Sequence, residues 1–306
     1  MVVGMVRKDS DTALLQKNGV ELRIGDLTDP ASLERATKGV DAVIHLAAYY
    51  SFTGSKDKYE LVNVQGTKSL MEAMLKNGVF RLIYCSSTEA TGPTPEPPAN
   101  EDSPSDSRYE YGRSKMRAED MVREYQKRGI KFTIIRPSGI YGPRNLDDVS
   151  YWFITSLANT WLSKIIIGDG KRLVQFAHIY DVVQGFILAL DKPKASVGKV
   201  YFITDSRAYS YDEVYAILAS VLGKDPPKWH VPVLLAKMLA APVQAFNWLR
   251  RKPSFIWRID SMDVFRVDRW YSIERAQKEL GYQPKHSLSD GLKETVDWYR
   301  ANGYVK

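Results

Sequence analysis

Short apolar runs of strand length alternate with segments of helical periodicity through the first half of the chain. The apolar runs are nearly continuous, which is typical of strands in a parallel sheet that has helices packed on both faces. Alternation of such strands with helices indicates an α/β fold. The expected strands are 20–24, 41–48, 81–87 and 131–137, and the expected helices are 30–39, 59–78 and 111–129.

The second half of the chain has longer helical patterns and fewer strand-length runs. Helices are expected at 147–164 and 211–223, and the segment 175–190 leads into another helix. The tail 272–304 is expected to hold two helices separated by a Gly-Tyr-Gln-Pro stretch. This half is less repetitive than the first, and we expect it to form a substrate lobe.

The composition is that of an ordinary globular protein, with 306 residues of which 44% are hydrophobic and 26% charged. The single cysteine, Cys85, excludes a disulfide framework and is expected to be a small buried apolar residue. No secretory signal pattern is visible, so a reducing, cytoplasmic setting is expected.

Basic residues outnumber acidic ones, with 43 Lys and Arg against 36 Asp and Glu, which gives a net charge of +7. Such an excess attracts an anionic cofactor, a nucleic acid or an anionic membrane. The charges are spread along the chain, and zinc-finger spacing, an RNA-binding aromatic motif and a long basic stripe are all missing from the sequence. We therefore expect no nucleic-acid partner and no metal site.

The segment 231–252 is the most apolar stretch of the chain, but Lys237, Pro242 and Gln244 interrupt it. These interruptions argue against a membrane-spanning helix. Two interpretations remain open: a helix that lies on a membrane surface, and a cap over an apolar pocket.

The clearest local motif is Tyr-Gly-Arg-Ser-Lys, in which Tyr111 and Lys115 are four residues apart and share one face of a helix. An ammonium close to a phenol favours the phenolate and lowers the pKa of the phenol. Such a tyrosine can exchange a proton with a substrate oxygen near neutral pH. Of the 18 tyrosines, Tyr111 alone has a lysine four residues later.

Several predicted strands end in small or polar residues at the edge where ligands bind in open parallel sheets. Ser86 and Ser87 end the strand 81–87, where a serine can hydrogen-bond a substrate oxygen that gains negative charge. Ala47 and Ala48 end another strand, and their small side chains would let a flat cofactor approach the backbone.

These motifs, in this order and spacing, resemble the extended short-chain dehydrogenases/reductases of the NAD-dependent epimerase/dehydratase superfamily. The resemblance implies a Rossmann-like doubly wound parallel sheet that binds NAD(P), with a smaller C-terminal substrate lobe. It implies an NAD(P)-binding domain at 1–147 to which 171–204 returns, and a substrate lobe at 148–170 and 205–306. The motifs that carry it are 25–29, 43–48, 63–67, 84–87, 111–115 and 136–143.

The same resemblance assigns site residues by position. Tyr111 is implied as the catalytic acid/base, Ser87 as the residue that polarises the reacting oxygen, and Lys115 as the ligand of the nicotinamide ribose that tunes Tyr111. The other residues implied at the cofactor are Asp26 and Leu27 at the adenine, then Leu46, Ala47, Ala48, Asn63, Pro137 and Ser138.

The family also begins with a strand and a Gly-x-x-Gly-x-x-Gly turn that binds the pyrophosphate, and nothing in this chain matches that turn. The opening Met-Val-Val-Gly-Met-Val-Arg-Lys resembles the second strand of the fold instead, with Gly4 as its only glycine. The missing strand is central in the order 3-2-1-4-5-6, so the second and third strands are expected to lack the neighbour that joins them to the fourth. We expect a truncated chain; a reduced pseudoenzyme is the alternative.

Arg7 ends this opening strand, near the position expected for the adenosine ribose. An acid there would accept a 2′-hydroxyl, whereas an arginine suits a 2′-phosphate. Arg7 therefore favours NADP, with NAD as the alternative cofactor and a solvated basic turn as the non-functional interpretation.

Departures from the family pattern narrow the substrate. In the dehydratases of the family an Asp-Glu pair stands where this chain has Thr88-Glu89. In the resemblance to sugar-nucleotide epimerases, an arginine that contacts the nucleotide stands where this chain has Val174. The segment 174–185 and the tail resemble the branch of 3β-hydroxysteroid dehydrogenases and dihydroflavonol reductases. Within that segment His178 and Asp181 are expected to be structural, and Tyr180 departs from the usual aspartate.

That branch interconverts a hydroxyl and a ketone on large apolar molecules, which implies a sterol-, flavonoid- or isoprenoid-like substrate. The apolar segment 231–249, with Trp229 and Trp248, would suit such a pocket or form lobe core. The alternatives are a nucleotide-sugar epimerase and a non-catalytic binding protein of the same fold. Family members also dimerise, so a homodimer in which 111–129 takes part is expected.

Overall fold

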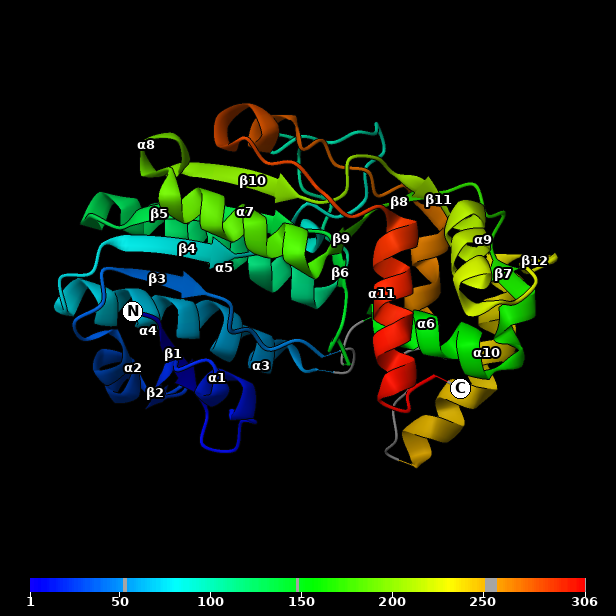
Figure 1. The fold of residues 1–306 in the computed structure, drawn as a ribbon, viewed down its shortest axis with the longest axis horizontal. Coiled ribbons are helices and arrows are strands. Elements are labelled where there is room, and N and C mark those ends of the chain that lie inside the picture. The colour runs from blue at the N-terminus through cyan, green and yellow to red at the C-terminus, as the bar shows by residue number, and fades with distance from the viewer. Residues whose placement is uncertain (52–53, 147–148, 251–257, 306) are drawn as a thin grey trace. The chain divides into compact units, whose positions relative to one another are not determined.

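The computed structural model describes residues 1–51, 54–146, 149–250 and 258–305, and the chain forms two compact units (Figure 1). Unit 1 comprises 1–91, 105–136 and 189–200, and unit 2 comprises 92–104, 137–188 and 201–306. The assignment of a cofactor domain and a substrate lobe to particular segments stays a prediction.

A parallel sheet is the centre of the α/β architecture. Its four strands are β3 (Ala42–His45), β4 (Arg81–Cys85), β5 (Lys131–Pro137) and β10 (Lys199–Ile203), in the order β10-β5-β4-β3. Strand β4 pairs in parallel with β3 on one side and with β5 on the other. These parallel pairings confirm the predicted Rossmann-like α/β class.

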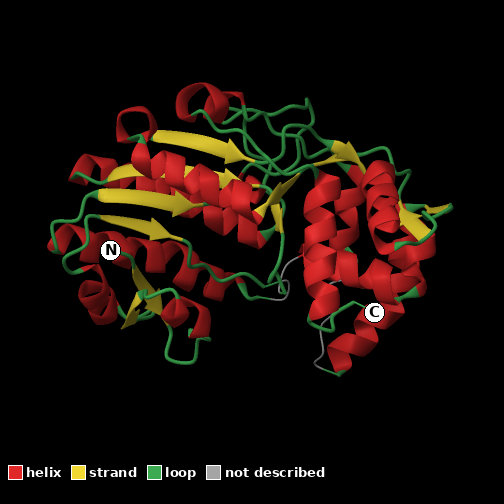
Figure 2. Cartoon of the chain, viewed as in Figure 1, coloured by secondary structure: helices red, strands yellow, loops and turns green. Residues whose placement is uncertain are grey.

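Helices pack against these strands through an apolar core (Figure 2). They are α2 (Pro30–Thr37), α4 (Gly66–Lys76) and α5 (Glu110–Tyr125). Asp29 caps α2 by accepting hydrogen bonds from two backbone N–H groups, and Pro30 follows at the first helical position. The core of this unit includes Leu33, Met71, Leu82, Ala118 and Phe132, each at most 3% exposed.

The opening run of the chain is a strand, as predicted. β1 (Val3–Val6) pairs in parallel with β2 (Glu21–Ile24), and the short helix α1 (Ala13–Lys17) connects them. These two strands form a sheet of their own beside the four-stranded sheet (Figure 1). Strands β1 and β2 were expected to have no pairing with the strand of 41–48, and in the structure they lie in a different sheet from β3.

The expected helix at 59–78 is a composite of three parts. A four-residue α3 (Lys56–Tyr59) leads into the π-helical segment η1 (Glu60–Gln65), and α4 follows. A π-helical turn inserts an extra residue and shifts the side chains that follow, and such turns are frequent at functional sites. The strand expected at 41–48 ends at His45, so Leu46 to Ala48 lie beyond it.

Unit 2 is built around three helices, α6 (Val149–Asn159), α9 (Tyr211–Leu222) and α11 (Leu288–Ala301). A capping box between Ser210 and Glu213 begins α9, and Gly223 ends it in a left-handed conformation. The predicted bounds of α9 are therefore confirmed. Of the two helices expected in the tail, the first is the π-helical η6 (Ala276–Leu280) and the second is α11.

The other strands among the described residues of unit 2 form two-stranded pairs. β6 (Gly139–Tyr141) pairs with β9 (Phe176–His178), β7 (Ile165–Ile167) with β12 (Trp229–Val231), and β8 (Leu173–Val174) with β11 (Tyr209–Ser210). Helix α7 (Ile179–Asp191) follows β9, and α10 (Val233–Leu249) follows β12. Of the helices that the structure describes, none has the length and apolar character needed to cross a membrane.

Candidate active site

The carboxyl end of β4 carries the two predicted serines, and they have different roles. Ser86 Oγ donates a hydrogen bond to Glu119 Oε1 at 2.6 Å, so its hydroxyl is engaged in the interior. Ser87 Oγ accepts a hydrogen bond from the backbone N–H of Glu89 at 3.1 Å and caps the short helix η2 (Thr88–Ala90). That contact uses a lone pair of Ser87 and leaves the hydroxyl hydrogen as a donor for a ligand.

Lys115 ties helix α5 to the same strand end. Its side chain is buried, and its Nζ donates a hydrogen bond to the backbone carbonyl of Cys85 at 2.7 Å. The ammonium also lies 4.8 Å from the centroid of the Tyr84 ring, a cation–π contact. Burial lowers the pKa of Lys115. The predicted lysine and the end of strand β4 are therefore brought together.

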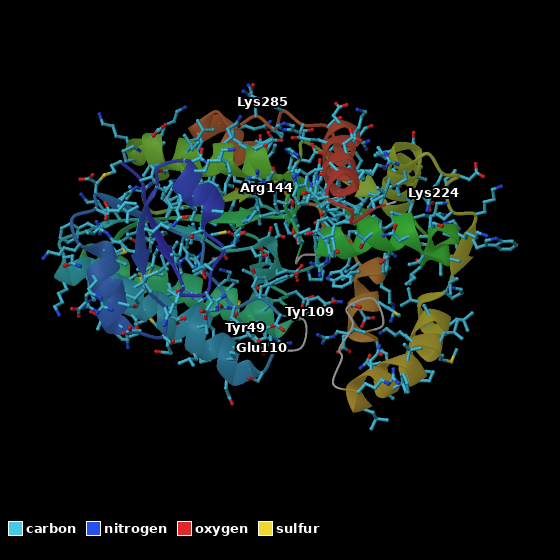
Figure 3. The ribbon with its side chains drawn as sticks, turned by 60° about the horizontal axis from the view of Figure 1, so that its bottom comes forward. Tyr49, Tyr109, Glu110, Arg144, Lys224 and Lys285 are labelled. Carbon is cyan, nitrogen blue, oxygen red and sulfur yellow. The ribbon has the colours of Figure 1, made fainter. Side chains whose placement is uncertain are left out.

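Tyr111 lies in the first turn of α5, within a group of tyrosines. Its ring makes an edge contact with Tyr50 at a centroid separation of 4.8 Å, and Tyr59 of α3 lies 6.4 Å away. Figure 3 labels Tyr49 and Tyr109, which mark the loop after β3 and the start of α5. Tyr111 thus has aromatic neighbours from two other elements of unit 1.

Gly112 permits a close approach between α5 and η2. A Cβ at this position would lie 2.2 Å from the carbonyl oxygen of Glu89 and 2.4 Å from Ser107 Oγ. Only a residue without a side chain fits there, so the turn that holds Tyr111 packs directly on the helix that Ser87 caps. The three predicted catalytic residues therefore lie on elements that pack together, Ser87 at the start of η2 and Tyr111 and Lys115 in α5.

A buried acid behind this junction was missed in the sequence analysis. Glu119 accepts hydrogen bonds from Ser86, from Arg136 Nε at 2.8 Å and Nη2 at 2.6 Å, and from Arg123 Nη2 at 2.9 Å. Burial raises the pKa of Glu119, but the bonds and charge of Arg136 outweigh burial, so the pKa lies below its usual value. The sequence contains a feature that could have identified Glu119, because it follows Lys115 by four residues and therefore lies on the same inward face of α5.

Arg7 directly follows β1, and Asp26 lies two residues after the neighbouring strand β2. Asp26 Oδ1 accepts hydrogen bonds from Thr28 N at 2.8 Å and Thr28 Oγ1 at 2.6 Å. The bonds from Thr28 are the main cause that lowers the pKa of Asp26, and the positive charge of Arg7 adds to them. The two residues predicted near the adenosine are therefore close enough to interact, with Arg7 exposed.

Leu27 and the loop after β3 differ in exposure. Leu27 is only 6% exposed, and a Cβ on Gly66 would lie 2.8 Å from its Cβ, so α4 packs closely on it. Leu46, Ala47 and Ala48 are exposed beyond the carboxyl end of β3. Their exposure suits a ligand contact, which stays a prediction for all four residues.

Asn63 holds this loop in place. Its Oδ1 accepts a hydrogen bond from Tyr49 N at 2.6 Å, and its Nδ2 donates to Tyr49 O at 3.0 Å and to Ser114 Oγ at 2.9 Å. The amide side chain therefore links the loop after β3 to helix α5. These bonds indicate a positioning residue, and a direct cofactor contact by Asn63 stays a prediction.

Pro137 and Ser138 belong to unit 2. Ser138 is buried, and its Oγ lies 2.7 Å from Thr204 Oγ1 in a hydrogen bond. Val174 of the same unit is buried in β8, and Arg172 forms an ion pair with Asp268 at 3.3 Å. The expected cofactor contacts of Pro137 and Ser138 stay predictions.

A cluster in unit 2 has the residue types of a metal site. His178, His286 and Glu294 each offer a ligand atom within 4.8 Å of the others. The two histidine rings pack on each other, with centroids 4.1 Å apart and an interplanar angle of 31°. Asp181 accepts hydrogen bonds from the backbone N–H groups of Lys285 and His286 and from His286 Nδ1. These contacts favour a structural role for the cluster.

The residues present fit both ends of a dinucleotide. Arg7 and Asp26 supply a polar pair at the ends of two parallel strands, and the β4–α5 junction supplies a lysine and a serine donor. No turn in the sequence matches the glycine motif that would hold the pyrophosphate. The roles below are therefore assigned only to these two ends.

Residues 1–204 match the model of the NAD dependent epimerase/dehydratase family. The chain is 30% identical over 312 residues to short-chain dehydrogenase/reductase family 42E member 1 of Bos taurus, covering 94% of this chain and 78% of that protein. It is 29% identical over 311 residues to the human sterol-4-alpha-carboxylate 3-dehydrogenase, decarboxylating, covering 94% and 79%.

Two solved structures extend the comparison. The crystal structure of gox2253 has a TM-score of 0.82 at 27% identity, covering 99% of this chain and 91% of that one. The dTDP-glucose 4,6-dehydratase DesIV of Streptomyces venezuelae, solved with NAD bound, has a TM-score of 0.77 at 25% identity, covering 100% and 89%.

Proposed function

The chain belongs to the NAD dependent epimerase/dehydratase family and is an oxidoreductase of the short-chain dehydrogenase/reductase type; from this premise we propose its reaction. We propose that it interconverts a hydroxyl and a ketone on a mostly apolar small molecule of sterol, flavonoid or isoprenoid type. The observation that supports this proposal is the junction of β4, η2 and α5, where Lys115 bonds to the Cys85 carbonyl, Ser87 caps η2, and Gly112 lets the first turn of α5 approach η2.

Tyr111 exchanges the proton at the substrate oxygen. In the oxidation direction, its phenolic oxygen accepts the hydroxyl proton while the carbinol carbon gives up a hydride, and in the reduction direction the phenol donates that proton. Ser87 donates a hydrogen bond to the same oxygen and stabilises the charge that develops there. The nicotinamide cofactor supplies or accepts the hydride when it is bound.

Lys115 acts on Tyr111 through its charge. Its ammonium is held by the Cys85 carbonyl in a buried position, where a positive charge favours a nearby phenolate more strongly than it does in water. The rigid attachment to β4 fixes the lysine independently of the substrate. Contact of Lys115 with the nicotinamide ribose is part of the proposal.

NADP is the proposed cofactor form. Support comes from Arg7, whose exposed guanidinium follows β1 and whose charge acts on Asp26. A guanidinium recognises a 2′-phosphate with two parallel hydrogen bonds. The family match supports a nicotinamide dinucleotide as cofactor without distinguishing NAD from NADP, and Arg7 is the residue that favours NADP.

The apolar substrate class has two supports. A relative that matches 94% of this chain acts, by its name, on a sterol carboxylate. In addition, the chain has Thr88-Glu89 where the dehydratases have an Asp-Glu pair. The apolar, buried Val174 stands where the epimerases have an arginine that contacts the nucleotide. Both features favour a hydroxyl/ketone conversion over the epimerase alternative.

The proposal is tested by Tyr111→Phe in the full chain, with Tyr109→Phe as the matched control. Tyr109 precedes α5 by one residue and is also a partly buried tyrosine. Loss of the proton-transfer group lowers kcat by about 10²- to 10⁴-fold. Affinity for the cofactor, measured by quenching of tryptophan fluorescence, should stay unchanged in both variants.

Turnover that survives in Tyr111→Phe would remove Tyr111 from the mechanism. Conversion of a substrate to its epimer without net cofactor consumption would instead favour the nucleotide-sugar epimerase. Absence of cofactor binding in the unchanged chain would favour the non-catalytic binding protein.

A further inference from the structure

Helix α10 exposes large apolar side chains over its length. Six of them lie between 43% and 72% exposed, which is unusual for a seventeen-residue helix of a folded unit. They recur at helical spacing and so share the outward part of the helix surface. The six are Leu234, Leu235, Met238, Leu239, Phe246 and Leu249; we call this set the outer face of α10.

The opposite side of α10 holds small and polar residues, and it faces the rest of unit 2. Ala236 and Ala240 are buried against Met262. Lys237 Nζ donates a hydrogen bond to Asp263 Oδ1 at 2.6 Å, and Gln244 Oε1 accepts one from the backbone N–H of Ile259 at 2.8 Å. The helix thus turns its polar groups toward the protein and its largest apolar groups away from it.

This arrangement is the reverse of an ordinary surface helix, which buries its apolar stripe and hydrates its polar face. In water, the outer face forgoes the stabilisation that burial of its leucines would give. An ordinary surface helix would have its leucines at the buried positions 236 and 240 and its alanines on the exposed side. The reversal indicates that the outer face meets an apolar environment.

We propose that the outer face of α10 docks on the surface of a lipid bilayer that contains anionic lipids, with the helix lying in the plane of the interface. A partly buried amphipathic helix of this kind needs no spanning length, which agrees with the lack of a spanning helix in the described part of the chain. This inference concerns where the protein acts and does not depend on the chemistry at Tyr111.

The charges around α10 fit an anionic lipid surface. No acidic residue occurs between 233 and 250, and the chain as a whole carries +7. Arg250 follows the helix, and its guanidinium carbon lies 4.6 Å from the centroid of the Phe246 ring. Trp229, in the strand just before α10, is 70% exposed. Arginine and tryptophan beside an apolar face are typical of segments that bind at the lipid interface.

The test is co-sedimentation of the full chain with vesicles of phosphatidylcholine and phosphatidylglycerol in equal parts. The double variant Leu235→Ser, Leu239→Ser removes two exposed leucines one helical turn apart. Its control is Val183→Ser, Ile187→Ser, which removes two exposed apolar residues at the same spacing on α7. Partitioning should fall by at least about tenfold in the α10 variant and stay unchanged in the α7 variant.

Arg250→Gln tests the electrostatic part. Its binding to the mixed vesicles should weaken by about fivefold, while its binding to pure phosphatidylcholine vesicles should not change. Tyr111→Phe should bind vesicles as the unchanged chain does, so failure of the proposed reaction and failure of membrane docking are distinguishable.

Three outcomes would overturn the inference. The unchanged chain does not bind vesicles; or the α7 variant loses binding as much as the α10 variant; or the chain self-associates without lipid and the α10 change abolishes that self-association in analytical ultracentrifugation. The last result would identify the outer face as a contact between copies.

Discussion

His45 is a buried histidine that faces the same interior as Lys115. Its Nε2 lies 3.0 Å from Thr67 Oγ1, and the Thr67 hydroxyl in turn donates to the carbonyl of Asn63. Burial, with a smaller effect of the Lys115 charge, lowers the pKa of His45 to about 3. His45 is therefore neutral in the folded chain over most of the acidic range, whereas it becomes charged in the unfolded chain below about pH 6.5.

This difference predicts acid sensitivity. Between about pH 6.5 and pH 3 the unfolded chain binds a proton at His45 that the folded chain does not bind. The free energy of unfolding should therefore fall by about 1.4 kcal/mol per pH unit from this group as the pH decreases. Above about pH 6.5 the group contributes no pH dependence, because it is neutral in both states.

Urea unfolding of His45→Asn at several pH values measures this contribution, with the exposed His230→Asn as control. The slope should become shallower by about 1.4 kcal/mol per pH unit in the His45 variant, and the His230 variant should keep the slope of the unchanged chain. Equal slopes in the unchanged chain and in His45→Asn would mean that His45 is not the group that titrates.

At the residue scale, the sequence was sufficient to predict candidate catalytic residues but not the side chains that hold them in place. Tyr111, Ser87 and Lys115 stood out because their types and spacing have a chemical meaning. Glu119 and Asn63 did not, because their importance comes from partners distant in sequence, such as Arg136 and Tyr49. Periodicity gives the inward face of a helix but not the residue it meets.

At the scale of elements, the approach of α5 to η2 depends on Gly112. Replacement of a helical glycine by alanine ordinarily stabilises a helix by about 0.5–1 kcal/mol. Here the added Cβ would lie 2.2 Å from the Glu89 carbonyl oxygen, within the backbone, where no side chain can move aside. The cost of displacing α5, about 1–3 kcal/mol, should exceed the gain.

Gly112→Ala should therefore lower the free energy of unfolding and reduce kcat, because the turn that holds Tyr111 moves away from Ser87. Glu124→Ala on the exposed side of the same helix is the control. Stability and turnover are measured by urea unfolding and steady-state kinetics. A stabilised and fully active Gly112→Ala chain would show that this close approach is not needed.

Element types followed from the sequence more reliably than their exact form. The strand of 131–137 was predicted with its observed bounds, and Gly129 ends the helical segment before it with a φ of 101°. The π-helical segments at 60–65 and 276–280 were not foreseen, since one extra residue in a turn leaves the overall apolar spacing nearly unchanged. The strand at 41–48 was predicted too long because its apolar run continues past His45.

At the scale of the whole molecule, the sequence predicted the α/β class and left the direction of α10 open. An apolar segment can face a pocket, the core or a membrane with the same periodicity, and only the packed partners of Ala236 and Ala240 show which side faces the protein. Trp248, which the sequence analysis linked to an apolar pocket, has a side chain outside the described part of the structure. The expected homodimer stays a prediction that the ultracentrifugation above also measures.

The central claim, that this chain transfers hydride between a nicotinamide cofactor and a carbinol carbon of an apolar molecule, has a direct test. The full chain is given a sterol ketone with NADPH or NADH deuterated at the transferring position, and the product is analysed by mass spectrometry and NMR. The account predicts one deuterium on the carbon that bears the new hydroxyl, faster with NADPH, with that preference lost in Arg7→Gln and the product absent in Tyr111→Phe. An unlabelled product, or a substrate epimerised without consumption of cofactor, would contradict it.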